Sequence, residues 1–326
     1  MLLAGDVGGT KTLLGLFDAD ARRPRPIVVR SFPTLDFQDL EAMLAAFLRD
    51  AQVPGTASRT IDVACFGVAG PVVADTATLT NVPWTIDASR VGVALGIERV
   101  HLLNDLQAMA VGATVLEAAE LCVLQDGEAL PGGNMAVIAA GTGLGEALLH
   151  NVGGRLIPSA TEGGHADFAA RTEREIRLLR DLTKRFGRAQ VEHVLSGSGL
   201  VHIHRSLHAH CAASVDLDHI DAPADISTAA LSGRAPCCRD TLDLFIEAYG
   251  AEAGNLALRS VALGGVFVGG GIAPKILPAI TDGRFMRAFR AKAPFEAMLA
   301  RIPVQLILNA ETGLLGAAVF AGGLVT

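Results

Sequence analysis

Three glycine-rich segments, each directly after a predicted strand, are the first residues of this sequence that could carry chemistry. They are residues 5–10 (GDVGGT), 141–145 (GTGLG) and 269–273 (GGGIA). Glycine lets the backbone approach an anion closely, and successive N–H groups in such turns form concavities that bind phosphate. For any one segment a hairpin turn is the commoner explanation, but three at strand ends together favour phosphate binding. Neither GxGxxG opening a helix nor the GxxxxGK[ST] loop is present in its proper context.

Two side chains in or beside the first segment could assist. Asp6 could orient a Mg²⁺ ion through water, since Mg²⁺ prefers oxygen ligands and keeps several of its waters. The alternative is a turn aspartate that bonds its own backbone. Lys11 could reach a phosphate, although a solvated strand residue is the favoured interpretation.

A polar constellation lies outside the glycine segments. Asn104 and Asp105 follow a predicted strand and begin a helix, a position where ligands gather in open α/β sheets and where either residue could also be a simple helix cap. Glu162 and His165 are flanked by glycines outside any periodic segment. Carboxylates accept sugar O–H bonds, while amide and imidazole groups both donate and accept, so the set suits a polyhydroxylated ligand.

The elements expected to position these residues alternate between strands and helices. Two short strands joined by the first glycine turn are predicted within residues 2–17, and further strands over 27–32, 61–68, 99–103, 136–140, 147–152, 266–269 and 303–308. Helices are predicted over 37–51 (with Asp36 as its N-cap), 85–95, 106–114, 174–186, 198–210, 239–263 and 312–321. The alternation implies crossover connections and a partly parallel sheet, and the second half repeats the strand, Gly/Thr turn, strand outline of the first.

Composition excludes several classes of protein. The chain has 326 residues, 50% hydrophobic and 19% charged, with a formal net charge of −7, which argues against disorder and against nucleic acid as a partner. Apolar runs over 135–149 and 256–273 are interrupted by Glu146 and by Arg259, so no membrane span is expected. Five cysteines without CxxC spacing indicate reduced thiols in a cytoplasmic protein and no zinc signature.

The order of the motifs resembles that of the bacterial glucokinase family of actin-like sugar kinases. The matching stretches run through nearly the whole chain: 5–10, 80–84 (TNVPW), 103–105, 141–145, 162–168 (EGGHADF), 192–200 (EHVLSGSGL) and 269–272. The resemblance implies an α/β, two-lobed actin-like ATPase (ribonuclease H-like) fold with a cleft between a small domain, residues 1–111 plus 306–326, and a large domain, residues 112–305. It also implies an ATP-dependent glucokinase that phosphorylates D-glucose at the 6-hydroxyl.

The resemblance further implies a role for each matching residue. Asp105 would be the general base facing the 6-hydroxyl, and Asn104, Glu162, His165 and Glu192 would hold the remaining hydroxyls. ATP and Mg²⁺ would be the cofactors, bound by Gly5, Asp6, Val7, Gly8, Gly9, Thr10, Gly141, Thr142 and Gly143 at the phosphates and by Gly270 and Gly271 on the adenosine side. The partners expected are D-glucose, ATP and a second copy of the chain in a homodimer, with neither nucleic acid nor membrane.

Other readings stay open at this point. A kinase for another hexose or an N-acetylhexosamine would need the same residues, because epimers differ by one hydroxyl position. A sugar sensor on the same scaffold would need a DNA-reading module, and an actin-like ATPase acting on proteins has no reason for the Asn104-Asp105 and Glu162-x-x-His165 pairs. No protein-ligated metal is expected: the cysteines cannot form the zinc motif of the related ROK kinases, and His204 and His208, although four residues apart, are expected to be solvent-exposed.

Overall fold

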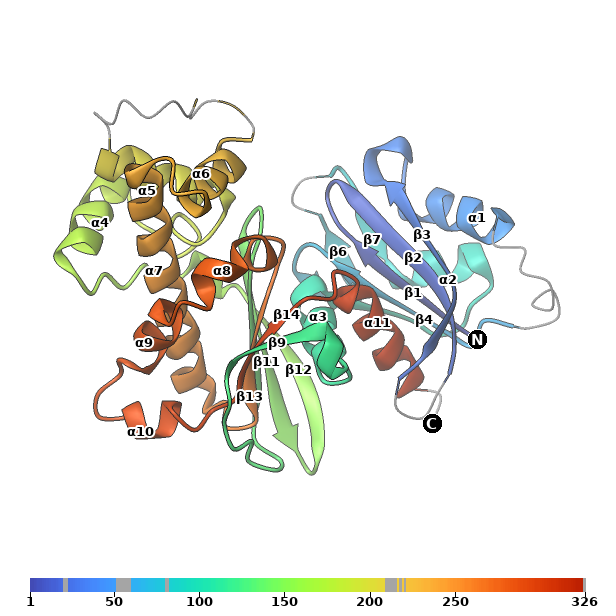
Figure 1. Ribbon diagram of the computed structural model, residues 1–326. Helices are drawn as coiled ribbons and strands as arrows, with labels where there is room; N and C mark the ends of the chain where they lie inside the picture. The colour runs from blue at the N-terminus through green and yellow to red at the C-terminus, as the bar shows by residue number, and fades with distance from the viewer. Residues whose placement is uncertain are drawn as a thin grey trace. The chain divides into compact units, whose positions relative to one another are not determined.

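The computed structural model describes residues 1–19, 23–50, 60–79, 82–208, 216, 219 and 221–324 (Figure 1). The chain forms two compact units: unit 1 comprises Met1–Glu120, Pro158–Ala160 and Asn309–Thr326, and unit 2 comprises Leu121–Ile157 and Thr161–Leu308. Residues after 111 stay with unit 1 because Arg23 donates to Val115 O at 3.3 Å and to Glu120 Oε2 at 2.7 Å. The units therefore divide at 120–121 and 308–309, in place of the expected 111–112 and 305–306.

Unit 1 is built on a five-stranded sheet of order β3-β2-β1-β4-β8. Its strands are β1 (Leu2–Val7), β2 (Lys11–Asp18), β3 (Arg25–Pro33), β4 (Val63–Val68) and β8 (Val100–Asn104). β1 to β3 form antiparallel hairpins, whereas β4 is parallel to both β1 and β8. Asp6 is level with Gly67, and Val68 with Asn104. The registers therefore bring the carboxyl ends of β1, β4 and β8, and the polar residues there, to one edge of the sheet.

Alternating residues of these strands face two different layers of helices. On one face Leu3 and Phe66 pack against α1 (Leu40–Asp50) and α2 (Ala88–Leu95). On the other face Leu2 and Cys65 pack against α3 (Asp105–Ala113) and α11 (Thr312–Gly322). This period-two alternation is what a sheet covered on both sides requires.

The starts of two helices differ from the expected ones. The side chain of Asp39, not that of Asp36, accepts the α1 backbone bond, from Ala42 N at 2.8 Å, because Asp36 lies within the preceding short turn η1 (Thr34–Asp36). The helix expected to begin at residue 85 starts only at Ala88, since Thr85–Asp87 forms the strand β7 and Asp87 caps α2 through Arg90 N at 3.0 Å.

α3 and α11 lie side by side with backbone against backbone (Figure 1). A Cβ added at Gly112 would overlap the carbonyl oxygen of Thr312, and one added at Gly316 would lie 2.6 Å from the Ala108 carbonyl carbon. Both approaches are closer than real Cβ contacts, so this seam exists only because glycines form it.

Unit 2 contains a six-stranded sheet of order β12-β11-β10-β13-β14-β9. Its strands are β9 (Leu121–Gln125), β10 (Met135–Ala140), β11 (Leu144–Val152), β12 (Arg155–Thr161), β13 (Gly265–Gly269) and β14 (Val304–Ile307). β13 is parallel to both β10 and β14, and β11 runs antiparallel to β10. Edge strands β9 and β12 were not expected from the sequence, because they lie half-exposed and carry no continuous apolar run.

One face of this sheet packs on helices. Ile138, Val268 and Leu306 belong to a single core with side chains of the surrounding helices. Those helices are α4 (Glu173–Phe186), α5 (Gly197–His208), α6 (Ala222–Leu231), α7 (Pro236–Ser260) and α9 (Arg284–Arg290). The shorter elements of the chain are β5 (Val72–Val73), β6 (Thr76–Thr78), η2 (Ala118–Glu120), η3 (Gly163–His165), η4 (Ala273–Ile276), α8 (Leu277–Ile280) and α10 (Glu296–Leu299).

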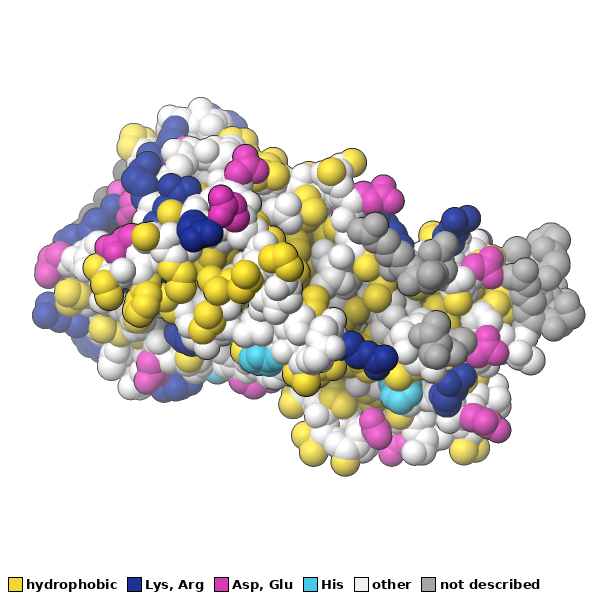
Figure 2. Space-filling view, turned by 90° about the horizontal axis from the view of Figure 1, so that it is seen from below, with side chains coloured by type: hydrophobic (Ala, Val, Ile, Leu, Met, Phe, Trp, Pro, Cys, Tyr) yellow, Lys and Arg dark blue, Asp and Glu magenta, His cyan; other side chains and the backbone are white. Residues whose placement is uncertain are grey.

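Charged residues on α4 form the solvent-exposed face of an amphipathic helix. Leu178 and Leu182 are buried, while Arg185 pairs with Asp181 at 2.6 Å. On the face of the molecule shown in Figure 2, basic and acidic side chains are interspersed over the helical end of unit 2. Among the described helices, none combines the length and the apolar composition needed to cross a bilayer.

Candidate active site

The first glycine turn joins β1 to β2 and is fastened by a threonine from outside the hairpin. Gly8 N donates to Lys11 O at 3.2 Å, which closes the turn. The hydroxyl of Thr34 donates to Gly8 O at 2.8 Å and lies 2.9 Å from the buried hydroxyl of Thr12. The turn that carries Gly8, Gly9 and Thr10 is thus held at a fixed position at the sheet edge.

Asp6 precedes this turn on β1, and its carboxyl group faces the start of α11. A Cβ at Gly313 would lie 3.0 Å from Asp6 Oδ2, so glycine at that position gives the carboxylate its room. Burial raises the pKa of Asp6 to about 6, an effect that the positive charge of Lys11 opposes. A single carboxylate at this edge of the sheet fits Mg²⁺, which takes one or two protein carboxylates and completes its shell with water and substrate phosphates.

Asn104 and Asp105 form the junction between β8 and α3. Asn104 is the N-cap: its Oδ1 accepts from Leu106 N at 3.0 Å, and its own N–H donates to Gln107 Oε1 at 2.9 Å, which completes a capping box. Its amide nitrogen donates to Gly70 O at 3.2 Å. Leu106 N also donates to Asp105 Oδ1 at 2.9 Å, so the first turn of the helix orients the Asp105 carboxylate. The capping interpretation and the ligand interpretation of this pair are therefore compatible.

The second glycine turn, between β10 and β11, contacts one of the predicted sugar-binding residues. Glu192 Oε2 accepts from Leu144 N at 2.8 Å, and a Cβ at Gly143 would lie 3.2 Å from the Glu192 Cδ atom. Gly197 N donates to Gly141 O at 2.9 Å, which ties the turn to the start of α5. Within unit 2, a predicted phosphate-binding turn and a predicted hydroxyl ligand thus share one contact.

The third glycine segment lies beside the second because β13 is parallel to β10. Gly270 has φ +84° and lies against the backbone of Ala140, where a side chain would not fit. Tyr249 of α7 is fully buried, and its hydroxyl accepts from Ala140 N at 3.1 Å and lies 3.2 Å from Gly269 O. One phenol therefore holds the ends of both strands. At the neighbouring Gly271, an added Cβ would meet no atom within 4 Å.

Glu162 immediately precedes the short 3₁₀ turn η3 and His165 is its last residue, and more than half of each side chain is exposed. Their nearest atoms, Glu162 Oε2 and His165 Nε2, are 4.0 Å apart. His165 Nδ1 donates to Gln190 Oε1 at 2.8 Å, which leaves Nε2 of the neutral ring as an acceptor. Glu192 N donates to Gly164 O at 2.8 Å, so Glu162, His165 and Glu192 gather in one part of unit 2.

Sequence reasoning missed the residues that support the ones it found. His165 is oriented by Gln190, the ends of β10 and β13 are held by Tyr249, and Gly313 gives the Asp6 carboxylate its room. None of these three supporting residues belongs to a motif. Each lies far along the chain from the residue it supports, so only a three-dimensional contact reveals it. Thr80 and Asn81 of the matching 80–84 stretch lie outside the described residues, whereas Trp84 is buried in the core of unit 1.

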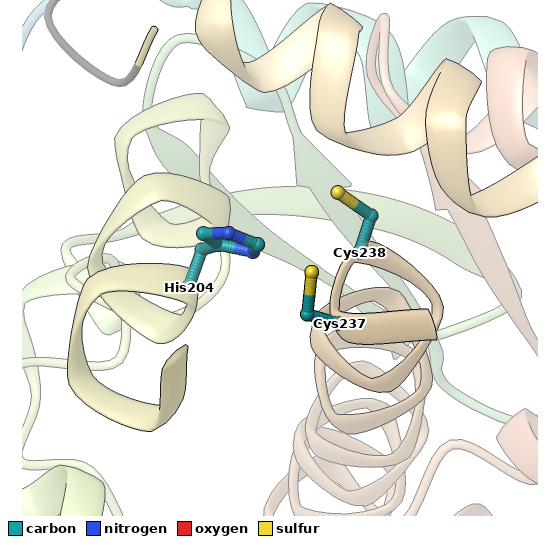
Figure 3. A group of neighbouring side chains, drawn as sticks. All are labelled: His204, Cys237 and Cys238. Atoms are coloured by element: carbon teal, nitrogen blue, oxygen red, sulfur yellow. The ribbon is translucent and has the colours of Figure 1, made fainter. Parts of the chain in front are cut away.

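A possible metal-binding group lies elsewhere in unit 2. His204, Cys237 and Cys238 face one another across α5 and the first turn of α7 (Figure 3), with their potential ligand atoms within 4.8 Å of each other. However, Cys237 is disulfide-bonded, and His204 Nδ1 lies 2.9 Å from Thr241 Oγ1. Cys237 therefore has no thiolate that could bind a metal, and His204 has a structural role through its contact with Thr241.

Two expectations about these side chains are corrected. Reduced thiols were expected throughout; Cys65, Cys122 and Cys238 are free thiols, but Cys237 forms a disulfide. His204 was expected to be solvent-exposed and is only 3% exposed, because it lies on the face of α5 that packs against α7. Apolar residues three and four positions away on α5 belong to or pack against the same core, so their spacing could have indicated that His204 is buried; they are Leu200, Val201 and Leu207.

Two hollows open on the surface away from all these residues. One of about 500 Å³ lies along α2 in unit 1, lined by residues such as Ser89 and Glu98. The other, of about 340 Å³, lies between β9 and α9 in unit 2. Their described lining residues include none of the predicted ligands, and their open, shallow form gives no reason to move the site there.

Comparison with known proteins decides the family. The family model described as Glucokinase matches residues 3–323. The curated glucokinase of Nostoc punctiforme is 42% identical, with 99% of both chains covered. The chain belongs to the glucokinase family. A second glucokinase, from Xanthomonas campestris, is 37% identical over 98% of this chain and 94% of its own. Family and enzyme class, a glucokinase, are therefore as the motifs predicted.

Solved structures of glucokinases agree with the fold. The crystal structure of a glucokinase from an Antarctic psychrotroph superimposes with a TM-score of 0.88 at 32% identity, covering 99% of this chain and 98% of that one. A ROK family glucokinase from Streptomyces griseus, solved in complex with glucose and AMPPNP, gives a TM-score of 0.64 at 22% identity and 98% coverage of both chains. The two-domain α/β fold of the actin-like sugar kinases, expected from the resemblance, is confirmed.

Proposed function

We propose that the protein transfers the γ-phosphoryl group of ATP to the 6-hydroxyl of D-glucose, with Asp105 as the general base. Support comes from the family and from one observation in unit 2: Glu192, a predicted sugar ligand, accepts a hydrogen bond from Leu144, which ends the phosphate-binding turn. A sugar and a nucleotide phosphate bound to these groups would be neighbours. That proximity is the main requirement of phosphoryl transfer, in which positioning and charge stabilisation matter more than covalent chemistry.

Each residue in the proposal has one task. Asp105 accepts the proton of the attacking hydroxyl, and the N–H of Leu106 fixes the orientation of its carboxylate, since orientation matters at least as much as basicity for such a base. Glu162 and Glu192 accept O–H bonds from the sugar, and His165 accepts through Nε2 while Gln190 holds its other nitrogen. Asn104 contributes its amide from the same junction as the base.

The nucleotide side of the proposal uses backbone groups. The N–H groups of residues 9, 10, 142 and 143 donate to phosphate oxygens, while those of Gly8 and Gly141 close their own turns. Gly270 and Gly271 lie on the adenosine side. Asp6 would hold a Mg²⁺ ion through water, and the bound ion would offset negative charge on the phosphates. The Streptomyces griseus protein, with glucose and AMPPNP in its crystal structure, supports the choice of both ligands.

A coupled assay of ADP formation, together with calorimetry of glucose binding, tests the base. Asp105→Asn should lower kcat by about a thousandfold or more while the glucose Kd changes little, because the amide keeps the shape and loses the basicity. Asp50→Asn, an exposed carboxylate at the end of α1, is the matched control and should leave kcat unchanged. A folded Asp105→Asn variant with nearly normal kcat would remove Asp105 from this role.

The remaining parts of the proposal have their own measurements. A panel of hexoses and N-acetylhexosamines, with ATP and with or without Mg²⁺, tests the sugar and the metal. We also propose a homodimer in the cytoplasm. Light scattering at micromolar concentration would contradict the dimer by giving the mass of a single 33.8 kDa chain.

A further inference from the structure

A buried acid lies beneath the segment that carries Glu162 and His165. Glu146, on β11, is 1% exposed, and among the described residues its Oε1 atom is buried without a hydrogen-bond partner. A buried carboxylate without full pairing is costly, so such a group is uncommon unless it has a task. No step of the proposed phosphoryl transfer uses it.

The carboxyl group of Glu146 touches the sugar-binding segment directly. A Cβ at Gly163 would overlap Glu146 Oε2 and lie 2.8 Å from Cδ. Gly163 does not have a positive φ, so the approach to Glu146, and not the backbone conformation, is what requires glycine there. Thr161 Oγ1 donates to Glu146 O at 3.0 Å and accepts from Gly163 N at 3.1 Å. Both the backbone and the side chain of Glu146 therefore support the residues between Thr161 and His165.

The charged neighbours of Glu146 come from α7. Arg259 lies 3.9 Å from Glu146 Oε2 but is held at 2.8 Å by the carboxylate of Glu252, which is itself buried. The hydroxyl of Tyr249, also on α7, is hydrogen-bonded to backbone groups. Lys292 donates to the side-chain oxygen of Asn255, whose amide nitrogen donates to Glu252. Within the segment itself, Glu162 and His165 flank Gly163. Burial, and next the charge of Glu252, raise the pKa of Glu146 to about 7, while Arg259 opposes the shift.

We infer that Glu146 is a positioning residue for the sugar, which sets glucose affinity through Gly163 according to whether its carboxyl carries a proton. When it is protonated, the neutral group stays buried against Gly163 in the arrangement described. When it is ionised, the uncompensated charge is repelled by Glu252 and drawn toward Arg259, and the glycine in contact with it moves. The inference rests on the proposed function, because it requires Glu162 and His165 to hold the sugar.

The first experiment measures the glucose KM and kcat of the protein from about pH 5.5 to about pH 8.5, on either side of the transition expected near pH 7. The KM of the unaltered protein should rise with pH by about tenfold more than that of Glu146→Gln, with similar kcat profiles, because a tenfold difference corresponds to one pKa unit of coupling. Identical KM profiles for the two would overturn the inference.

Neighbour substitutions separate this role from a merely structural one. Glu252→Gln should move the midpoint of the KM profile to lower pH, because it removes the like charge, and Arg259→Gln should move it to higher pH. Glu128→Gln, an exposed residue paired with Arg301, is the control and should leave the midpoint where it is. Midpoints that stay fixed, or that move together in one direction, would contradict the inference even if Glu146→Gln failed to fold.

A double-mutant cycle tests the contact itself. Gly163→Ala should weaken glucose binding by about tenfold in the unaltered protein and by much less in the Glu146→Ala background, where the space exists. Additive effects would show that the two residues act independently. Hydrogen exchange of the peptide containing residues 161–165 should rise with pH in the unaltered protein and not in Glu146→Gln, a readout that needs no activity.

One further variant distinguishes failure of the inference from failure of the proposed function. If His165→Ala leaves the glucose Kd unchanged, the sugar site itself is wrongly assigned. If His165→Ala weakens glucose binding and Glu146→Gln keeps the KM profile of the unaltered protein, only the role of Glu146 is wrong.

Discussion

The two halves of the chain present the same device, a strand, a Gly/Thr turn and a return strand, but support it differently. The turn at residues 8–10 is fastened by neutral hydroxyl groups, with Thr34 bonding Gly8 O. The turn at residues 141–143 is fastened by the carboxylate of Glu192, which is itself a predicted sugar ligand. If both turns bind phosphate as we propose, the first would serve phosphate alone, whereas the second would link phosphate binding to sugar binding.

The strongest test of this contrast replaces one glycine in each turn. Gly143→Ala should lower kcat/KM for glucose on the order of a hundredfold, because its Cβ displaces the Glu192 carboxylate and breaks the bond to Leu144. Gly8→Ala, which meets only the Lys11 carbonyl, should raise the KM for ATP with little effect on the KM for glucose. Steady-state kinetics with each substrate varied would measure both. Equal losses of kcat/KM for glucose in Gly143→Ala and Gly8→Ala would contradict the distinction between the two turns. Gly141→Ala, whose added Cβ would meet no atom within 4 Å, is the control for kcat/KM for glucose.

Removing the phenol that holds the second turn should destabilise unit 2. Tyr249→Phe leaves the buried Ala140 N–H without its acceptor, at a cost of about 2 kcal/mol in the free energy of unfolding. Urea denaturation would measure it, with the midpoint falling and the slope unchanged. No loss of stability would show that the ends of β10 and β13 hold together without the phenol.

The corresponding change in the first turn should cost less. Thr34→Val removes the hydroxyl that bonds Gly8 O and contacts Thr12, and we expect a loss of about 1 kcal/mol, since the turn lies near solvent, which can replace part of the bonding. The same denaturation experiment, read beside that for Tyr249→Phe, ranks the two supports. A larger loss for Thr34→Val would reverse the ranking.

The smallest expected effect concerns pH and Asp6. Its pKa in the folded protein, about 6, is raised from 3.8, so the unfolded state loses this proton first and stability falls as pH rises from about 4 to 6. Activity, which needs the ionised carboxylate in our proposal, should rise over the upper part of that window. Lys11→Met should move the acid limb of kcat/KM for ATP to higher pH, because the lysine charge lowers the pKa of Asp6. An unmoved limb would mean that another group controls it.

The sequence was sufficient for the elements whose residues lie close together along the chain. The strands ending at Val7, Asn104 and Ala140 combine apolar runs with glycine or capping residues, which are local signals. Glu146, by contrast, stands out in the sequence only as the acid that interrupts the apolar run 135–149, because the glutamate and arginine of α7 that surround it lie more than a hundred positions away. Gln190 and the disulfide at Cys237 were not predicted for the same reason, because no local sequence pattern marks a contact between residues far apart in the chain.

The glycine seam between α3 and α11 has a consequence for the two acids at its ends. Asp105 begins α3, and Gly313, near the start of α11, lies against Asp6. Two helices that pack through bulky side chains can shift relative to each other when those side chains change rotamer. Helices in direct backbone contact do not have this freedom. The distance between Asp105, the proposed proton acceptor, and Asp6, the proposed magnesium-orienting carboxylate, should therefore stay constant on warming. A methyl group added at Gly112 or Gly316 should increase that distance.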